Sequence, residues 1–440
     1  LATPGAGKTI MAAEVARQLR IHKKIELVLC FSPSVNVAYD FRAAMEQRTG
    51  LRFDGELGAH GRSMTYQAML SLSDDFWALF ERNRILVIFD EIHHCAGQEL
   101  ARANSWGQKI IKAIQGRAAF TLALTGTPWR SDRIPISLSS YCEEGKIHCD
   151  FSYGLREAVS DFVCRLPRIC LVDNDNIQVD HIDAVTGFSS ISELLSSSLC
   201  SYQTLIENED LITFVLKKAS SLLETIRQKS PNAGGLIVAS SVMHAYEIAR
   251  LLHLTVGEKA CVVTHQSDEA QYLINRFKRD SMKWIISVGM ISEGTNIPRL
   301  QVCCHLTRIR TELHFRQVLG RVLRQTSNYS EVGHLIIPAA TEFIEFSKRI
   351  SEEIPGTAEV NFLSMHIEDS SDGNHEVEAQ SIRITQRNSE SDFANVKAEL
   401  FIADASSSIG KSDTVGDIRL NLFGRYRTEL LSLTRHIQGG

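Results

Sequence analysis

The sequence lacks the features that mark a membrane, secreted or strongly basic protein. Its 47 Lys and Arg residues are outnumbered by 52 Asp and Glu residues, which gives a net charge of −5. A nucleic-acid-binding surface would therefore have to be local. No apolar run is long enough to cross a membrane, no secretory leader is recognisable, and the first residue is Leu1 rather than Met. We expect a cytoplasmic protein with no membrane partner.

The ten cysteines include no CxxC pair, and most lie in apolar or strand-like segments. This distribution predicts reduced, buried thiols in a cytosolic protein. Cys142, His148 and Cys149 are close enough in sequence to suggest a metal site, but their spacing matches no standard zinc motif. We therefore do not predict a zinc site.

Short apolar runs alternate with helical patterns along much of the 440-residue chain, which favours parallel sheets built from βαβ units. The expected strands form two sets: residues 25–31, 85–89 and 120–124, then residues 235–239, 261–264, 284–288, 302–306 and 334–337. The helical patterns between the strands include residues 242–254, 269–278 and 311–324. The sequence thus predicts two α/β units rather than one.

The alternation stops between the two units and again near the end of the chain. Residues 173–183 are polar, whereas residues 190–199 and 211–227 have helical patterns. Residues 370–414 are rich in Ser, Asp, Glu and Asn, which is typical of mobile segments, and residues 417–437 predict a last amphipathic, basic helix. The expected organisation is a first domain at 1–170, a helical connector at 171–230, a second domain at 231–350, and a polar, partly disordered tail at 351–440.

Residues 2–9 have the sequence ATPGAGKT, which is typical of a phosphate-binding loop. Gly5 and Gly7 allow the backbone to bend tightly and aim N–H groups at phosphate oxygens. Lys8 would reach the β and γ phosphates, and the hydroxyl of Thr9 would hold Mg²⁺. The alternative is a glycine-rich turn before a helix, with Lys8 in solvent. Because the strand that should precede such a loop is absent, we expect a fragment of a larger protein.

An acidic pair follows the apolar run at residues 85–89. Carboxyl ends of buried parallel strands are where α/β sheets bind ligands. Asp90 would hold Mg²⁺, and Glu91 would orient and deprotonate an attacking water. The alternative is a pair that caps the next helix. The phosphate loop in the same unit favours the catalytic interpretation.

The sequence TGTP follows the expected strand at residues 120–124. Its two hydroxyls, from Thr125 and Thr127, would lie near residues 90–93 and could link nucleotide state to domain position. The alternative is an ordinary turn, which this sequence would form in any protein.

The motifs PGAGKT, DEIH, TGTP, SEGTNIP and QVLGRVLR follow one another in this order over roughly residues 1–340. Together they resemble superfamily 2 helicases of the DEAD/DEAH-box group. The connector and second domain are similar to bacterial and phage helicases grouped with restriction-enzyme motor subunits and radiation-resistance helicases. The resemblance implies two tandem RecA-like domains, ATP and Mg²⁺ as cofactors, and ATP-driven movement along nucleic acid. We expect DNA in preference to RNA, and RNA remains open because backbone contacts do not exclude it.

The resemblance also assigns nucleic-acid contacts, which position a strand without reading its sequence. They are Pro33, Ser34, Thr65, Tyr66, Gln67, Ser240 and Ser241. The alternative for each is an ordinary loop or helix cap. His93, Thr125 and Thr127 would couple hydrolysis to movement.

The remaining assignments concern the nucleotide. The cofactor-binding residues would be Pro4, Gly5, Ala6, Gly7, Lys8, Thr9, Gly294 and Asn296. Relatives commonly carry Asp where Asn296 stands, and an amide lacks that charge, which would weaken coupling of hydrolysis to movement. Relatives also place an adenine-recognising glutamine motif before the phosphate loop, and none is here.

Four residues with helical i, i+3, i+4 and i+7 spacing would cross from the second domain. They are Gln317, Gly320, Arg321 and Arg324. The resemblance implies that both arginines reach the γ phosphate, where a guanidinium stays charged and binds phosphate oxygens as a fork. Alone, the pattern would predict a solvated basic face.

Two other functions remain open. One is the motor subunit of a restriction or phage-defence complex that translocates without unwinding, with defence or repair subunits as partners. No nuclease motif is recognisable, so cleavage would need a partner or another segment. The other is a nucleotide-gated DNA-binding module with negligible turnover, against which the presence of Glu91 argues.

Overall fold

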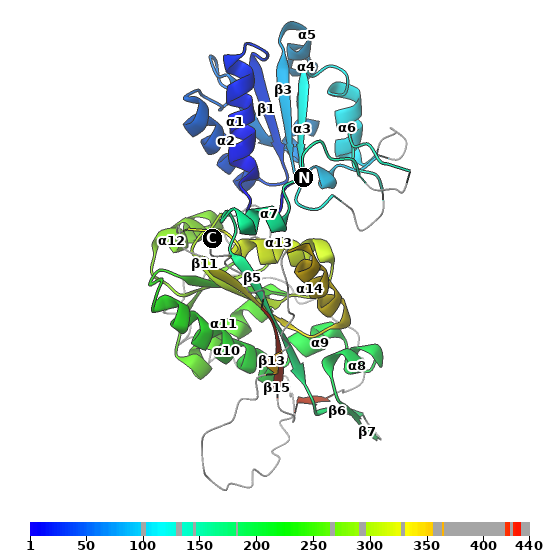
Figure 1. The fold of residues 1–440 in the computed structure, drawn as a ribbon, viewed down its shortest axis with the longest axis vertical. Helices are drawn as coiled ribbons and strands as arrows, with labels where there is room; N and C mark the ends of the chain where they lie inside the picture. Colours follow the sequence, from blue (N-terminus) through cyan, green and yellow to red (C-terminus); the bar gives the residue numbers. More distant parts are fainter. Residues whose placement is uncertain are drawn as a thin grey trace, which may run out of the picture.

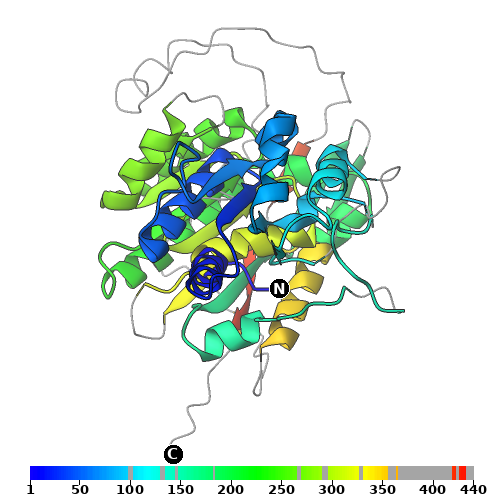
Figure 2. The ribbon, with the colours of Figure 1, turned by 90° about the horizontal axis from the view of Figure 1, so that it is seen from above.

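A computed structural model describes residues 1–97, 103–128, 134–143, 147–181, 184–264, 269–289, 296–326, 331–354, 363–364, 419–422 and 426–432. The described residues form two α/β lobes, with the first lobe stacked above the second (Figures 1 and 2). The chain passes from one lobe to the other beside the helix α7 (Leu155–Ser160). Two parallel α/β domains are the fold class that the sequence predicts.

The first lobe contains a four-stranded parallel sheet with the order β2-β1-β3-β4. Its strands are β1 (Leu27–Ser32), β2 (Gly61–Thr65), β3 (Ile85–Asp90) and β4 (Phe120–Leu124). Its helices are α1 (Lys8–Ile21), α2 (Val35–Thr49), α3 (Tyr66–Leu70), α4 (Asp74–Trp77), α5 (Leu79–Arg82) and α6 (Ser105–Ala113), with a 3₁₀ turn at Ile92–His94. The three strands expected in this part are present, and β2 was not predicted.

Side chains of the central strands alternate between two apolar layers, as strand geometry requires. In β1, Val28 and Cys30 pack with α1 and α2, whereas Leu29 and Phe31 pack with α3 and α6. Figure 1 accordingly shows α1 and α2 on one side of the sheet and α6 on the other. Both faces of the sheet are therefore buried. Because β3 and β4 pair in parallel, their carboxyl ends lie side by side at one edge of the sheet.

The second lobe is built on an eight-stranded sheet with the order β13-β15-β5-β12-β11-β8-β10-β9, in which β13 is Leu363–Ser364 and β15 is Tyr426–Ser432. Its parallel strands are β5 (Leu166–Asn174), β8 (Gly234–Ala239), β9 (Ala260–Val263), β10 (Trp284–Ser287), β11 (Leu300–Leu306) and β12 (Val332–Pro338). Its helices are α8 (Ile191–Ser196), α9 (Tyr202–Ile206), α10 (Glu209–Arg227), α11 (Val242–Val256), α12 (Ala270–Arg279), α13 (Glu312–Val322) and α14 (Thr341–Glu353). The five strands predicted for this unit are all present.

The expected helical connector needs correction because strands occupy its beginning. The strand β5 pairs in parallel with β12, so it belongs to the second sheet, and a boundary at residue 170 falls inside it. Two further strands, β6 (Ile177–His181) and β7 (Ala184–Phe188), form an antiparallel sheet with β14 (Arg419–Leu422). Helices α8, α9 and α10 follow, as the helical part of the prediction requires.

The terminal helix expected at residues 417–437 is wrong. Residues Tyr426–Ser432 form β15, which pairs antiparallel with β5, and β15 in turn pairs with β13 (Leu363–Ser364). A short amphipathic segment can fit the hydrophobic period of a helix or that of a strand. The strand forms here because the edge of β5 offers backbone hydrogen bonds to it. Residues 370–414, expected to be mobile, lie outside the described residues.

The sequence predicts no membrane-spanning helix, no zinc site and no disulfide, and each expectation can be compared with the described residues. Within these ranges, no helix combines the length and apolarity that crossing a bilayer requires. No cluster of three or more potential metal ligands occurs there either, and Cys142, His148 and Cys149 form none. All ten cysteines are described and are free thiols, with seven of them buried.

Candidate functional site

The phosphate-loop sequence forms a tight turn at the start of α1. Gly5 and Gly7 have φ angles of 91° and 81°, in the left-handed region that favours glycine. Gly7 is also the N-cap of α1, so the first N–H groups of a 14-residue helix face the turn. The backbone therefore adopts a conformation in which N–H groups and a helix N-terminus converge, which suits an anion.

The acidic pair lies at the end of β3, beside this loop. The Nζ of Lys8 lies 3.3 Å from Oε1 of Glu91, and the N–H of Gly126 donates to the other carboxylate oxygen at 3.4 Å. Glu91 has a φ of 50°, an uncommon conformation for a residue with a side chain. Such backbone geometry is often found at functional sites.

Opposite pKa shifts distinguish the two carboxylates. Burial and the charge of Glu91 raise the pKa of Asp90. Burial would also raise the pKa of Glu91, but the charges of Lys8 and His93 outweigh it and lower that pKa. Two adjacent acids with divergent pKa values are a frequent feature of catalytic sites.

The three residues expected to couple hydrolysis to movement form one buried network. The Nδ1 of His93 lies 2.9 Å from the hydroxyl of Thr125, which donates to the carbonyl of Thr127 at 2.9 Å. The same Nδ1 lies 3.4 Å from Oε2 of Glu91. The network therefore connects Glu91 to the end of β4.

Tyr66 requires a correction, because it cannot contact a nucleic-acid backbone. Its side chain is fully buried, and its hydroxyl donates to the carbonyl of Asp90 at 2.8 Å. The ring also stacks on Trp106. Tyr66 therefore supports the end of β3 from the interior of the first domain, whereas the neighbouring Gln67 is exposed.

A single cavity of about 540 Å³ joins the phosphate loop to the second domain. The first domain contributes Pro4, Gly5, Gly7, Lys8, Thr9, Asp90 and Glu91, among others, and the second contributes Asn296, Gln317, Gly320, Arg321 and Arg324. Most of the expected nucleotide and catalytic residues thus line one space. Ala6 packs against the core of the second domain, and Gly294 lies outside the described residues.

Close packing brings the arginine-bearing helix to the phosphate loop. A Cβ placed on Gly320 would lie 2.4 Å from Cβ of Pro4, and one placed on Gly126 would lie 2.9 Å from Cδ of the same proline. Pro4 is therefore held between the TGTP turn and α13. Only glycine at both positions permits this approach.

The second-domain side of the cavity is strongly basic. Burial and the charge of Arg321 lower the pKa of Arg324 to about 9. Its Nη1 donates to Oδ1 of Asn296, and its Nε is buried without a hydrogen-bond partner. The buried Arg321 and the half-buried Arg324, with its unsatisfied Nε, are well suited to bind an anion.

The sequence prediction missed the helix that forms another wall of this cavity. Asp40, Ala43, Ala44 and Gln47 of α2 all line it, and their i, i+3, i+4 and i+7 spacing was the available signal. Burial raises the pKa of Asp40, against the opposing charges of Lys278, Arg324 and Arg321. Asp40 is thus an acid from the first domain that faces bases of the second.

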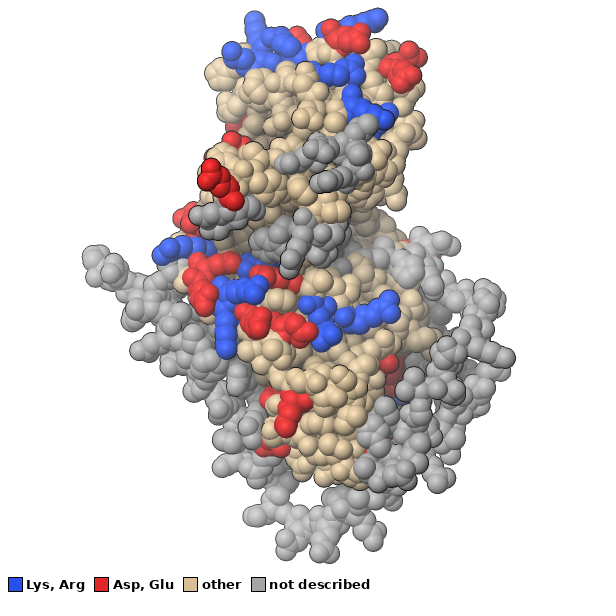
Figure 3. All heavy atoms as spheres, turned by 90° about the vertical axis from the view of Figure 1, so that its right-hand side faces the viewer, with Lys and Arg blue, Asp and Glu red and all other residues tan. Residues whose placement is uncertain are grey.

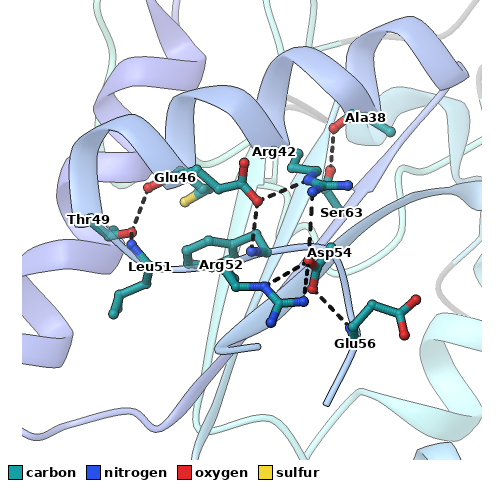
Figure 4. A network of polar contacts seen from close by, with 11 residues as sticks. Ala38, Arg42, Glu46, Thr49, Leu51, Arg52, Asp54, Glu56 and Ser63 are labelled. Carbon is teal, nitrogen blue, oxygen red and sulfur yellow. Dashed lines mark hydrogen bonds and ion pairs between the residues drawn. The ribbon is translucent and has the colours of Figure 1, made fainter. Parts of the chain in front are cut away.

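Polar contacts on the outer side of α2 fix this helix to the following loop (Figure 4). Glu46 accepts from Nε of Arg42 at 2.9 Å and from the backbone N–H of Phe53 at 3.0 Å. Asp54 pairs with Arg52 at 2.7 Å, and the hydroxyl of Ser63 donates to the carbonyl of Ala38. These contacts hold the cavity wall against β2.

The residues expected to contact nucleic acid are mostly helix caps. Ser34, Thr65 and Ser241 are the N-caps of α2, α3 and α11, and each accepts a hydrogen bond from the backbone N–H three residues later. The hydroxyl of Ser240 lies 2.8 Å from Nδ1 of His244, and Pro33 lines the cavity. Helix N-termini can also bind phosphates, so capping does not oppose the predicted role.

Charge is mixed on the face of the molecule shown in Figure 3. Basic and acidic side chains lie interspersed over the second lobe next to the junction. Ion pairs of the second domain include those of Arg316 with Glu312 and Glu353, and that of Arg349 with Glu312. This face therefore carries no continuous basic stripe, in agreement with the net charge of −5.

Two known protein families match the two parts of the chain that line the cavity. Residues 1–130 match the family model of the type III restriction enzyme res subunit, and residues 217–326 match the helicase conserved C-terminal domain. Both matched families are found in superfamily 2 helicases, so the chain is similar to these helicases in both of its domains. Helicase-family domains thus supply the phosphate loop on one side and the arginine helix on the other.

The chain is also similar to longer proteins. An uncharacterized protein of Mycobacterium tuberculosis, Rv2917, is 30% identical over 366 residues, which are 80% of this chain and 59% of that protein. An uncharacterized protein of Mycobacterium leprae is 29% identical over 369 residues, which are 80% of this chain and 60% of that protein. The chain thus spans less than two thirds of the length of these relatives.

Two solved structures share the fold. A fragment described as an HsdR subunit of a type I restriction enzyme from Vibrio vulnificus has a TM-score of 0.51 at 15% identity, covering 78% of this chain and 60% of that one. The type ISP restriction-modification enzyme LlaBIII, bound to DNA, has a TM-score of 0.50 at 12% identity, covering 80% and 28%. The two parallel domains are therefore tandem RecA-like domains.

Proposed function

We propose that this helicase chain hydrolyses ATP between its two RecA-like domains and uses the cycle to move along nucleic acid, DNA in the first place, in the cytoplasm. One observation carries the proposal: a single cavity is lined by the phosphate loop and acidic pair of one domain and by the arginines of the other. A ligand in this space touches both domains at once, so its loss can change their separation.

The cavity is suited to a nucleotide with a divalent cation. Its volume of about 540 Å³ lies within the range of roughly 300–1,000 Å³ typical of small-molecule sites. Lys8 and the N–H groups at the start of α1 would hold phosphates, and Thr9 with Asp90 would hold Mg²⁺. The raised pKa of Asp90 fits this role, because a cation would stabilise its buried charge. Mg²⁺ would neutralise charge on the phosphates during transfer.

Each remaining side chain has a definite task in this proposal. Glu91, whose pKa is lowered, stays ionised and accepts a proton from the attacking water. Arg321 and Arg324 bind the phosphate oxygens on which negative charge develops. The buried network of His93, Thr125 and Thr127 carries a change at Glu91 to the end of β4.

Nucleic acid would bind across both domains through helix N-termini. Ser34 begins α2 in the first domain, and Ser241 begins α11 in the second, in similar capping geometry. Contacts of this kind recognise phosphates without reading sequence. DNA is the preferred ligand in the proposal because LlaBIII, which shares the fold, is bound to DNA.

A second candidate is a motor of a restriction or defence assembly that translocates without unwinding. The match of residues 1–130 to the res subunit of type III restriction enzymes favours it. Protein partners would then supply any nuclease. A strand-displacement assay beside a translocation assay separates the two candidates, because only a helicase releases a displaced strand.

The primary test is phosphate release from ATP with and without single-stranded DNA, with RNA as a parallel arm. We expect turnover that DNA stimulates and that the Lys8→Ala variant lacks. Turnover retained by Lys8→Ala would contradict the phosphate-loop role. A DNA-binding protein without measurable turnover would instead support a nucleotide-gated binding module, and no response to either nucleic acid would exclude a motor.

A further inference from the structure

We propose that Arg165 is a positioning residue that fixes the nucleotide-facing edge of the second domain. It lies where the chain enters that domain, immediately before β5. The sequence pattern gave no reason to single it out. The inference rests on the proposed function, because it concerns the placement of Asn296, Arg321 and Arg324 for ATP hydrolysis.

The guanidinium of Arg165 is fully buried, and all five of its N–H donors have acceptors. Its Nε donates to the carboxylate of Glu331 at 2.6 Å. The other four donor positions serve Leu300 O at 2.7 Å, Val322 O at 3.2 Å, Pro298 O at 3.2 Å and the hydroxyl of Thr326 at 3.0 Å. A five-donor fork matches this set, whereas an ammonium group has only three donors.

The acceptors belong to the two segments that carry the second-domain lining of the cavity. Pro298 and Leu300 follow Asn296, and Val322 lies between Arg321 and Arg324. One side chain therefore connects the segment before β11 to the end of α13. A relative shift of these segments would move the cavity-lining groups away from one another.

Backbone contacts strengthen the same connection. The N–H of Arg165 donates to the carbonyl of Leu323 at 2.7 Å, and Cys164 forms an antiparallel bridge with Arg324. The segment that joins the two domains thus pairs directly with Leu323 and Arg324, at the end of α13. Arg165 fixes the cavity edge at the point where the two domains join.

A buried arginine is a costly way to stabilise a domain, because desolvating the charge offsets much of its attraction to Glu331. Its value lies in geometry: five fixed bonds specify the arrangement of three separate segments. Catalytic groups are sensitive to such placement, since a misplacement of about 1 Å can cost on the order of 100-fold in rate.

Arg299 provides a matched control. It is a half-buried arginine of the same domain, and it donates to three backbone carbonyls, those of Phe277, Asn232 and Met282. Its contacts join α12 to the segments before β8 and β10, and none of these three acceptor residues lines the cavity. The variants Arg165→Lys and Arg299→Lys both keep the charge and lose the fork, so they differ chiefly in which segments they loosen.

The test compares both variants with the parent chain in thermal unfolding, ATP affinity and DNA-stimulated turnover. We expect similar unfolding midpoints for the two variants and ATP affinity within about threefold of the parent. We also expect turnover lower by about tenfold or more in Arg165→Lys alone. Equal turnover in the two variants would overturn the inference and leave Arg165 a structural residue.

A double-mutant cycle with Arg324→Ala gives a measurement that general destabilisation would not change. If Arg165 acts by placing Arg324 together with Asn296 and Arg321, the loss of turnover in the double variant should be smaller than the product of the two single losses. Fully multiplied losses would overturn the inference. Absence of turnover in the parent chain would instead contradict the proposed function, so the two failures are distinguishable.

Discussion

Gly320 of α13 lies so close to Pro4 of the phosphate loop that a Cβ on the glycine would come within 2.4 Å of the Cβ of the proline. This contact is the point where the arginine helix of one domain touches the phosphate loop of the other. A methyl group at Gly320 would have to push the two domains apart. The distance between the arginines and the phosphate loop would increase accordingly.

The variant Gly320→Ala should therefore separate stability from activity. Alanine is favoured over glycine in a helix by about 1 kcal/mol, so the unfolding midpoint should stay the same or rise. Turnover should fall by about tenfold or more, because the arginines no longer reach the nucleotide. Phosphate release and calorimetry measure the two effects. Gly187→Ala in β7, where a Cβ meets nothing closer than 4.0 Å, is the control; parent-like turnover of Gly320→Ala would contradict the contact.

Replacement of Arg324 should affect turnover far more than ATP binding. Arg324 is half-buried and lines the cavity with its Nε unpaired, and such an arginine can contribute on the order of 10³-fold in rate. We expect a loss of that order in the turnover number of Arg324→Ala, with ATP affinity changed only a few-fold. Titration with a fluorescent ATP analogue supplies the affinity. The exposed Arg308→Ala serves as the control, and equal losses in rate and affinity would indicate a binding role only.

The helix cap at Ser34 allows the nucleic-acid contact to be tested without unfolding the helix. Asp and Asn are both good N-caps, so Ser34→Asp and Ser34→Asn should leave stability nearly unchanged. Only aspartate adds a negative charge, which costs about 1 kcal/mol at 4 Å from a phosphate in water. Fluorescence anisotropy should therefore detect DNA binding weakened about fivefold in Ser34→Asp alone. Ser190→Asp, at the N-cap of α8, is the control, and unaltered DNA binding by Ser34→Asp would refute the contact.

The second domain should lose stability as the solution becomes acidic. Burial and His314 lower the pKa of His305 to about 3, against an ordinary value of 6.5. The unfolded chain therefore binds a proton below about pH 6.5, and the folded chain does not until about pH 3. Stability is present above pH 6.5 and falls through this window, by up to about 1.4 kcal/mol per pH unit for one such group.

His305→Phe should reduce that pH dependence. The ring packs against Phe343, and the Nδ1 of His305 is buried without a partner, so phenylalanine removes an unsatisfied group. Urea unfolding between pH 6.5 and pH 4 measures the slope, which should become shallower by nearly one proton. His253→Phe, on the exposed side of α11, should retain the parent slope. An unchanged slope in His305→Phe would show that another group titrates.

The sequence predicted the strands that end at the site because local pattern and burial agree there. The run before Asp90 is apolar at every position, and β3 is buried on both faces as expected. Helix α13 contains Gln317, Gly320 and Arg321 as their spacing predicts, whereas Arg324 lies beyond its end at Val322. The phosphate loop follows its glycines. These features depend on residues close together in the chain, so a single sequence contains them.

Predictions failed where a partner distant in the sequence decided the outcome. Tyr66 was expected at a surface, but the carbonyl of Asp90 binds its hydroxyl inside the first domain. The segment Tyr426–Ser432 was expected to be a helix, but the edge of β5 takes it as a strand. Neither partner can be recognised from the neighbouring residues.

The sequence by itself thus determined the chemistry available to this protein: a phosphate loop, an acidic pair and two arginines three residues apart. Tertiary structure decided that Pro4 meets Gly320, that Asp40 joins the cavity, and that Arg165 connects the segments carrying the second-domain residues. The physical reason is range. Helical and strand periods act over a few residues, whereas packing and hydrogen bonding join groups whose separation in the chain exceeds 100 residues, as between Arg165 and Leu300.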